Sequence, residues 1–220
     1  MPYIPFILLS APEYIAVLFL TFALFRIKPQ GFYPHIVFVS FILGNVSYAT
    51  RADEAMAVWS SSLQMLVAVV CMWLLFRIPL FYAMIITTVT NVTYGFFQLL
   101  FFTGYLNYAI ISFEEVSSGS LVGYIVPLSS ILFTFLVILI IRRFNLSIDW
   151  IPNNPRARVP MNRGNIGFLV ITVVILMGYS TIFLWWSNGP VYIFQGITIV
   201  LIILLLCLIY MSRRKDQADD

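Results

Sequence analysis

The chain alternates long apolar stretches with short polar connections, and seven of these stretches contain about 20 mostly apolar residues each. A bilayer core of roughly 30 Å is crossed by a helix of about 20 residues that rises about 1.5 Å per residue. The pattern therefore predicts an all-α, polytopic membrane bundle. The whole chain, 1–220, is expected to form one transmembrane domain with a short tail at 212–220. The expected spans are residues 3–27, 32–50, 55–76, 79–104, 121–141, 166–186 and 191–211.

Lysine and arginine are divided unevenly between the two ends of these spans. Eleven of the 12 basic residues fall after the first, third, fifth and seventh spans, and Arg51 alone falls on the other side. Because cytosolic connections retain Lys and Arg, this division predicts an outer N-terminus and a cytosolic C-terminus. The expected location is the cell membrane, with multiple passes and the lipid bilayer as the principal partner.

Composition agrees with a membrane protein, since 61% of the residues are hydrophobic and 10% are charged. These values lie far from those of a soluble domain. The net charge of +3 is accounted for by topology, and no nucleic-acid partner is expected. Cys71 and Cys207 both lie in apolar stretches, where they are expected to be small buried hydrophobes rather than a disulfide or metal pair.

A polar stripe runs along the fourth predicted span. Thr87, Asn91, Tyr94 and Gln98 follow one another at spacings of four, three and four, which places them on one helical face. Lipid cannot satisfy such groups, so the stripe is expected to face other helices or a water-filled cavity.

Amide side chains from four spans are expected at a similar outer depth, namely Asn45, Gln64, Gln98 and Gln195. Asn45, Gln64, Asn91 and Gln98 are predicted to face the bundle interior. The functional interpretation is an outward-facing recess that binds an extracellular peptide or small molecule. The alternative is that these amides only join helices, at roughly 0.6 kcal/mol per hydrogen bond.

Carboxylates gather on the same outer side. Glu13 lies at or near the outer boundary of the first span, and Glu114 and Glu115 lie in the long outer connection. Negative charge on the outer side of the bundle attracts cationic ligand groups. Solvated loop charge is the competing interpretation.

Enzyme chemistry has little support in the sequence. A Cys/His peptidase would have to use Cys71 and the single histidine, His35, but no local motif places them together. There is no His/Glu metal pattern and no glycine-rich phosphate loop. The chain is therefore predicted to have no catalytic residues, no metal and no cofactor.

Three segments carry a family resemblance: "APEYIAVLFLTFALFRIKP", "VSYATR" and "LVILIIRRFNLSIDWIP". Over most of residues 10–150, the chain resembles the membrane sensor region of accessory-gene-regulator-type histidine kinases of Gram-positive bacteria. The resemblance implies a module that senses a secreted peptide. In that family, the last span leads into a helix with the phosphoacceptor histidine and then an ATP-binding domain. Here the sequence stops about nine residues past the last span, so a sensor without its kinase is expected.

Such a module would act through a separate kinase or another membrane partner. The basic residues expected to couple to that partner are Arg142, Arg143, Arg213 and Arg214. Two alternatives remain open at this point. The first is the substrate-binding membrane subunit of a transporter, and the second is a membrane peptidase that processes a signal peptide.

Overall fold

The computed structural model describes residues 3–57, 59–108, 110–111 and 124–148, together with the single positions 166, 167, 170, 171, 174 and 203. Within this part of the chain the secondary structure is helical and contains no strand. The all-α prediction is confirmed there. The helices are α1 (Tyr3–Leu24), α2 (Tyr33–Ala52), α3 (Glu54–Ala57), α4 (Ser60–Leu74), α5 (Leu80–Asn107) and α7 (Ile125–Arg143).

Three of the described helices, α1, α5 and α7, are long and apolar enough to cross a membrane, while α4 is apolar but shorter. Four expected spans overlap α1, α2, α5 and α7. The span expected at 55–76 is instead split between α3 and α4, with Trp59 outside both helices. The spans expected at 166–186 and 191–211 lie outside the described residues, apart from the single positions named above. Seven spans and their orientation therefore stay predictions.

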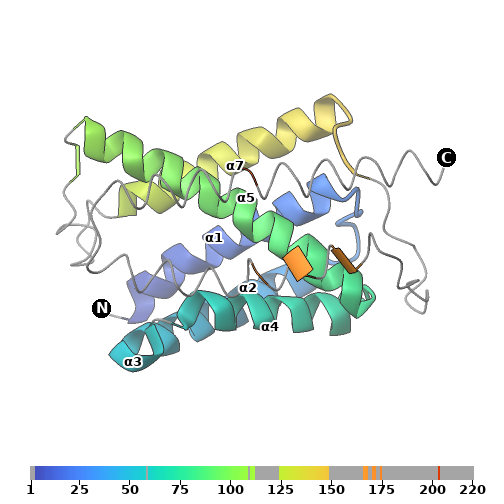
Figure 1. Cartoon of the computed structure of the whole chain (residues 1–220), viewed down its shortest axis with the longest axis horizontal. Coiled ribbons are helices and arrows are strands. Elements are labelled where there is room, and N and C mark those ends of the chain that lie inside the picture. The colour runs from blue at the N-terminus through green and yellow to red at the C-terminus, as the bar shows by residue number, and fades with distance from the viewer. Residues whose placement is uncertain are drawn as a thin grey trace.

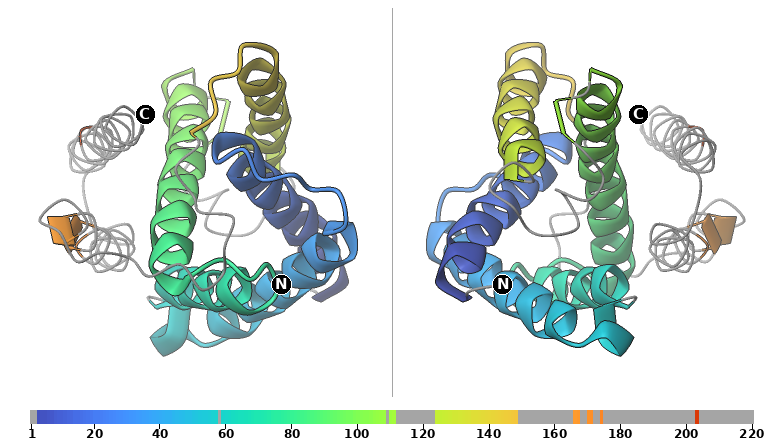
Figure 2. Two further views of the ribbon diagram at one scale, coloured as in Figure 1. Left: turned by 90° about the vertical axis from the view of Figure 1, so that its right-hand side faces the viewer. Right: turned by 90° about the vertical axis from the view of Figure 1, so that its left-hand side faces the viewer.

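Helix α1 occupies the middle of the bundle. It packs against α2, α5 and α7, and α4 packs against α2 and α5 (Figure 1). The end views show α7 on one side of α1 and α4 on the other (Figure 2). Gly44 of α2 faces α1, and a Cβ atom built at this position would lie 3.5 Å from Ile7 Cδ1, which is ordinary van der Waals contact, so an alanine would fit here.

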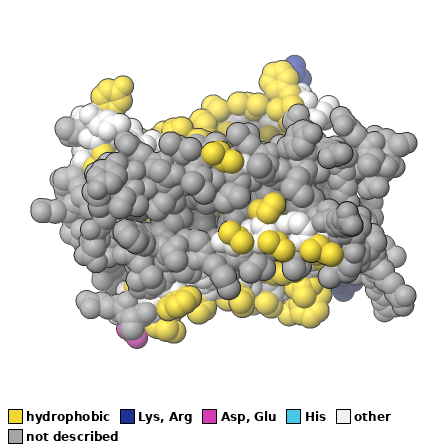
Figure 3. Space-filling model, in the orientation of Figure 1, with side chains coloured by type: hydrophobic (Ala, Val, Ile, Leu, Met, Phe, Trp, Pro, Cys, Tyr) yellow, Lys and Arg dark blue, Asp and Glu magenta, His cyan; other side chains and the backbone are white. Residues whose placement is uncertain are grey.

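Charge separates the two ends of the bundle. Residues near the ends of α1, α4 and α7 form what we call the basic end: Arg26, Lys28, Arg77, Arg142 and Arg143. Arg51, in the last turn of α2, lies at the opposite end, here called the Arg51 end. The space-filling view shows Lys and Arg side chains on the right and acidic ones at the lower left (Figure 3). The described Lys and Arg residues are therefore divided between the two ends of the bundle in the same way as in the sequence pattern from which the orientation is predicted.

Aromatic side chains fill the core near the basic end. Phe22, which is 1% exposed, packs edge to face on Phe76 with 5.3 Å between ring centroids. Phe32 lies 5.4 Å from Phe76 and 6.3 Å from Phe22. Edge-to-face pairs at these separations are favourable beyond the area they bury. By contrast, Leu132 on α7 is 72% exposed, as expected for a helix face that contacts lipid.

The helix ends at the basic end are built alike. "LFRIKP" closes α1 and "LFRIP" closes α4, so the two turns share most of their sequence, although the Ile78 N–H at α4 donates to Met72 O, one residue further back than the equivalent bond at α1. The arginine of each turn has a left-handed backbone, with φ of 52° at Arg26 and 56° at Arg77. At α1 the Ile27 N–H then donates to Phe22 O, the bond of a Schellman ending. Pro29 and Pro79 come next in the two turns, where the chain has already left the helix and the missing proline N–H costs no helical hydrogen bond.

Candidate functional site

Glu13 and Gln98 join two helices in the interior of the bundle. Gln98 Nε2 donates a hydrogen bond of 2.6 Å to Glu13 Oε1, which links α5 to α1. Counted along the helices at 1.5 Å per residue, Glu13 lies about 15 Å and Gln98 about 14 Å from the Arg51 end. The carboxylate therefore sits near the middle of α1, deeper than the outer boundary expected from the sequence.

Two further side chains act on this carboxylate, Tyr94 from close by and Arg51 through its charge. The hydroxyl of Tyr94 lies beside Glu13 and Gln98, and the Tyr94 side chain is 5% exposed. Arg51 attracts Glu13 electrostatically, and its guanidinium also lies 5.9 Å from the ring centre of Phe6. We call Glu13, Arg51, Tyr94 and Gln98 the Glu13 cluster. It combines one carboxylate, one cation, one amide and one phenol.

A second set of hydrogen bonds, the Tyr14 chain, connects α1, α4 and α2. Tyr14 Oη donates to Gln64 Oε1 at 2.5 Å, and Gln64 Nε2 donates to Ser60 Oγ at 2.6 Å. Ser60 Oγ also lies 2.6 Å from Thr50 Oγ1. Both ends of the Gln64 amide are therefore satisfied inside the bundle, which is how buried polar groups avoid a desolvation penalty.

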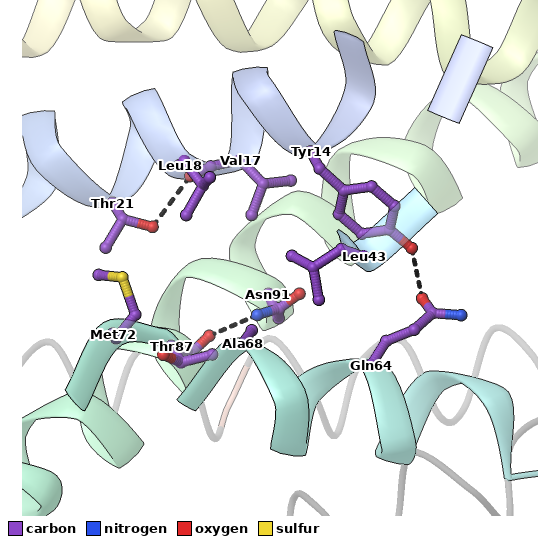
Figure 4. Close-up of a pocket in the computed structure, with 10 residues that line it drawn as sticks. All are labelled: Tyr14, Val17, Leu18, Thr21, Leu43, Gln64, Ala68, Met72, Thr87 and Asn91. Atoms are coloured by element: carbon purple, nitrogen blue, oxygen red, sulfur yellow. Dashed lines mark hydrogen bonds between the residues drawn. The ribbon is translucent and has the colours of Figure 1, made fainter. Parts of the chain in front are cut away.

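A small cavity lies between the Tyr14 chain and the aromatic core. It measures about 20 Å³, and a buried water needs roughly 10–15 Å³ by the same measure. Tyr14 and Gln64 line one side, Thr87 and Thr21 the other, and Asn91 lies between them (Figure 4). The remaining lining residues are Val17, Leu18, Leu43, Ala68 and Met72. The cavity has room for a water-sized group and not for a peptide.

The polar stripe on α5 lies where the sequence predicts it. Thr87 and Tyr94 are buried, and Asn91 and Gln98 are half-buried and point toward neighbouring helices. Asn91 Nδ2 donates to the carbonyl of Thr87 at 2.8 Å. Gln64 on α4 also faces the interior through its bond to Tyr14.

Asn45 is the exception, because it is exposed and takes no part in either set of contacts. Its Oδ1 accepts a 2.7 Å hydrogen bond from Tyr3 Oη, and its Nδ2 donates to Phe41 O at 2.8 Å. The prediction that Asn45 faces the interior is therefore wrong. The interior face of α2 is formed by Val39, Leu43 and Ser47, and a residue two positions from Leu43 lies on the opposite side of a helix.

The remaining predicted residues belong to the outer connection, the last span, the tail and the end of α7. Gln195, Glu114, Glu115, Arg213 and Arg214 lie outside the described residues. Arg142 and Arg143 are exposed in the last turn of α7. Their exposure is compatible with a role in coupling to a partner.

The residues that a peptidase would need occupy apolar surroundings. Cys71 is 8% exposed and belongs to the main hydrophobic core together with Met72 and Phe76. The ring of His35 lies 5.9 Å from Phe32 and 6.2 Å from Phe76 between centroids. Across the described ranges, no group of three or more His, Cys, Asp or Glu side chains is placed to hold a metal ion.

Sequence reasoning missed Tyr14, Ser60 and Thr50. Tyr14 follows Glu13 directly, and an aromatic near a predicted boundary reads as an interfacial anchor. Ser60 and Thr50 are small polar residues near helix ends, where they usually cap or meet water. Tyr14 and Gln64 lie at a similar predicted depth in the first and third expected spans. This shared depth is the signal in the sequence that could have indicated a hydrogen bond between them.

Compared with known proteins, the chain matches no protein-family model, no curated protein and no solved structure.

Proposed function

We propose that this chain is a membrane-embedded, receptor-like sensor module that binds an extracellular ligand and acts through a partner protein. The observation that carries this proposal is the Gln98 to Glu13 hydrogen bond between α5 and α1. Ionisable groups at membrane depth are costly, and they commonly mark ligand, ion or proton sites. A cationic group of a peptide or small molecule is the natural partner for this carboxylate.

Ligand binding at this position requires helix movement. Glu13 already accepts a hydrogen bond from α5, and none of the four residues of the Glu13 cluster lines the small cavity described above. A ligand cation that reaches Glu13 therefore competes with Gln98 and separates α1 from α5. The free energy of that competition is what couples binding to a change in shape.

Helix α1 provides a route from the Glu13 cluster to the basic end. Leu20 and Ala23 of α1 share a buried hydrophobic cluster with Phe97 of α5 and with Ile138 and Ile141 of α7. This cluster lies two turns further along α1 than Glu13. Because α7 then ends in two exposed arginines, a shift of α1 changes their position at the surface where a cytosolic partner is expected.

Pull-down from native membranes tests this function. After mild crosslinking, a histidine kinase or response regulator is expected among the proteins recovered with the tagged chain. Replacing Arg142 and Arg143 together by alanine is expected to lower its recovery by about tenfold, since each lost charge pair is worth roughly 0.2–1 kcal/mol. Arg77→Ala, at the same end of the bundle but on α4's turn, is the matched control and should leave recovery unchanged.

One outcome would count against the sensor, and another against the coupling role of α7. Recovery of an ATPase subunit of a transporter would favour the substrate-capture alternative. Recovery of a kinase with equal yield from the double variant and from Arg77→Ala would show that the end of α7 is not the coupling surface.

A further inference from the structure

The cavity contains a hydroxyl that the rest of the bundle does not satisfy. Thr87 lines it from α5 and is 3% exposed, yet its Oγ1 has no hydrogen-bond partner among the described residues. A buried hydroxyl without a partner carries a desolvation cost, so such atoms call for a physical explanation.

The neighbouring threonines on the same helix behave differently. Thr90 Oγ1 donates to Ile86 O at 2.8 Å, and Thr93 Oγ1 donates to Val89 O at 2.7 Å. This back-bonding to the carbonyl four residues earlier is the usual solution for threonine inside a helix. Thr87 does not adopt it, and its side chain borders the cavity together with Asn91 and Tyr14 (Figure 4).

The volume of the cavity and the side chains that line it indicate which molecule can bind there. A volume of about 20 Å³ holds one water, which needs roughly 10–15 Å³ and two to four polar partners. Polar groups come from α1, α4 and α5, through Tyr14, Gln64, Thr87 and Asn91. No charged side chain is among the lining residues, which favours a neutral molecule over an ion.

We propose that this cavity binds a single water molecule, which pairs with Thr87 Oγ1 and bridges α5 to polar groups of α1 and α4. The site is distinct from the Glu13 cluster and does not depend on the chain being a sensor. It makes the contact between these three helices partly water-mediated in the middle of the bundle. A water-mediated contact is nearly as favourable as a direct hydrogen bond.

Two buried methionines on α4 give a direct test. Met72 is 1% exposed and lines the cavity, whereas Met65 is 3% exposed and does not. In X-ray radiolysis of the purified full chain in lipid nanodiscs, hydroxyl radicals made from a bound water oxidise the side chains beside it. Met72 is expected to be oxidised several-fold faster than Met65. Equal rates for the two methionines would overturn the proposal.

Threonine variants provide an independent readout. Thr87→Val removes the hydroxyl at constant shape and is expected to reduce Met72 oxidation to the Met65 rate. It should also lower the unfolding temperature by about 2–4 °C through loss of the bridge. Thr88→Val is the matched control, because Thr88 Oγ1 is also buried without a partner but does not line the cavity. Its unfolding temperature should stay the same or rise. A rise for Thr87→Val, with Met72 oxidation unchanged, would show that Thr87 is unsatisfied and the cavity dry.

Discussion

Replacing Gln98 by methionine is expected to lower the free energy of unfolding by about 2 kcal/mol. Methionine keeps the length and approximate volume of the side chain but has no N–H group. Glu13 Oε1 then loses the donor that now lies 2.6 Å away. Hydrogen bonds to charged groups are worth roughly 1.5–3 kcal/mol, and the Tyr94 hydroxyl and the Arg51 charge still act on Glu13 in the variant, so the loss falls in the lower part of that range. Reversible unfolding of the purified chain in detergent micelles measures this loss.

The same substitution in a Glu13→Gln background isolates the pair. A glutamine at 13 keeps an oxygen that accepts from Gln98, so this variant alone should unfold at nearly the wild-type free energy. Because this background has no carboxylate that could lose its donor, Gln98→Met should lower the free energy of unfolding by less than about half as much as it does in the wild type. An equal loss in both backgrounds would mean that Gln98 stabilises the bundle through contacts other than Glu13.

Replacing Phe22 by alanine is expected to lower the free energy of unfolding by about 3 kcal/mol or more. Phe22 is 1% exposed and packs against Phe32 and Phe76 at the basic end. Large-to-small changes of this kind remove packing contacts and leave a cavity, at roughly 3–5 kcal/mol for phenylalanine. Helix association within lipid depends on such packing, because lipid tails are as apolar as the side chain itself. The unfolding midpoint in the same micelles reports the loss.

Phe38→Ala is the control for this loss. Phe38 lies on α2 and is 58% exposed, so its ring contacts few protein atoms. The expected change is within about 0.5 kcal/mol. If Phe38→Ala proved as costly as Phe22→Ala, the assignment of buried and lipid-facing sides on α1 and α2 would be wrong.

The sequence predicts the helices and the polar face of α5 because both depend on local spacing. Thr87, Asn91, Tyr94 and Gln98 share one side of any continuous α-helix, and α5 is continuous from Leu80 to Asn107. The rotation of each helix toward its neighbours depends on packing. Asn45 shows this: its depth was inferred from the sequence, but the buried face of α2 is set by Leu43 and Ser47.

The break between α3 and α4 was missed for a related reason. Hydropathy averaged over a window detects the apolar content of residues 55–76 but is insensitive to a local turn. Here α4 begins at Ser60, whose hydroxyl joins Thr50 of α2 and Gln64 of its own helix. The Tyr14 chain that results depends on three helices meeting, which spacing along any one of them does not reveal.

The side of the membrane that the Arg51 end faces decides whether an extracellular ligand can approach the Glu13 cluster from that end. Single cysteines at Asp53, near the Arg51 end, and at Lys28, at the basic end, are exposed positions that report the two sides. With Cys71 and Cys207 replaced by alanine, intact cells are treated with a membrane-impermeant maleimide. The receptor account predicts that the cysteine at 53 is labelled in intact cells. It also predicts that the cysteine at 28 is labelled only after the cells are permeabilised. The reverse pattern would place the Arg51 end in the cytosol and contradict the account.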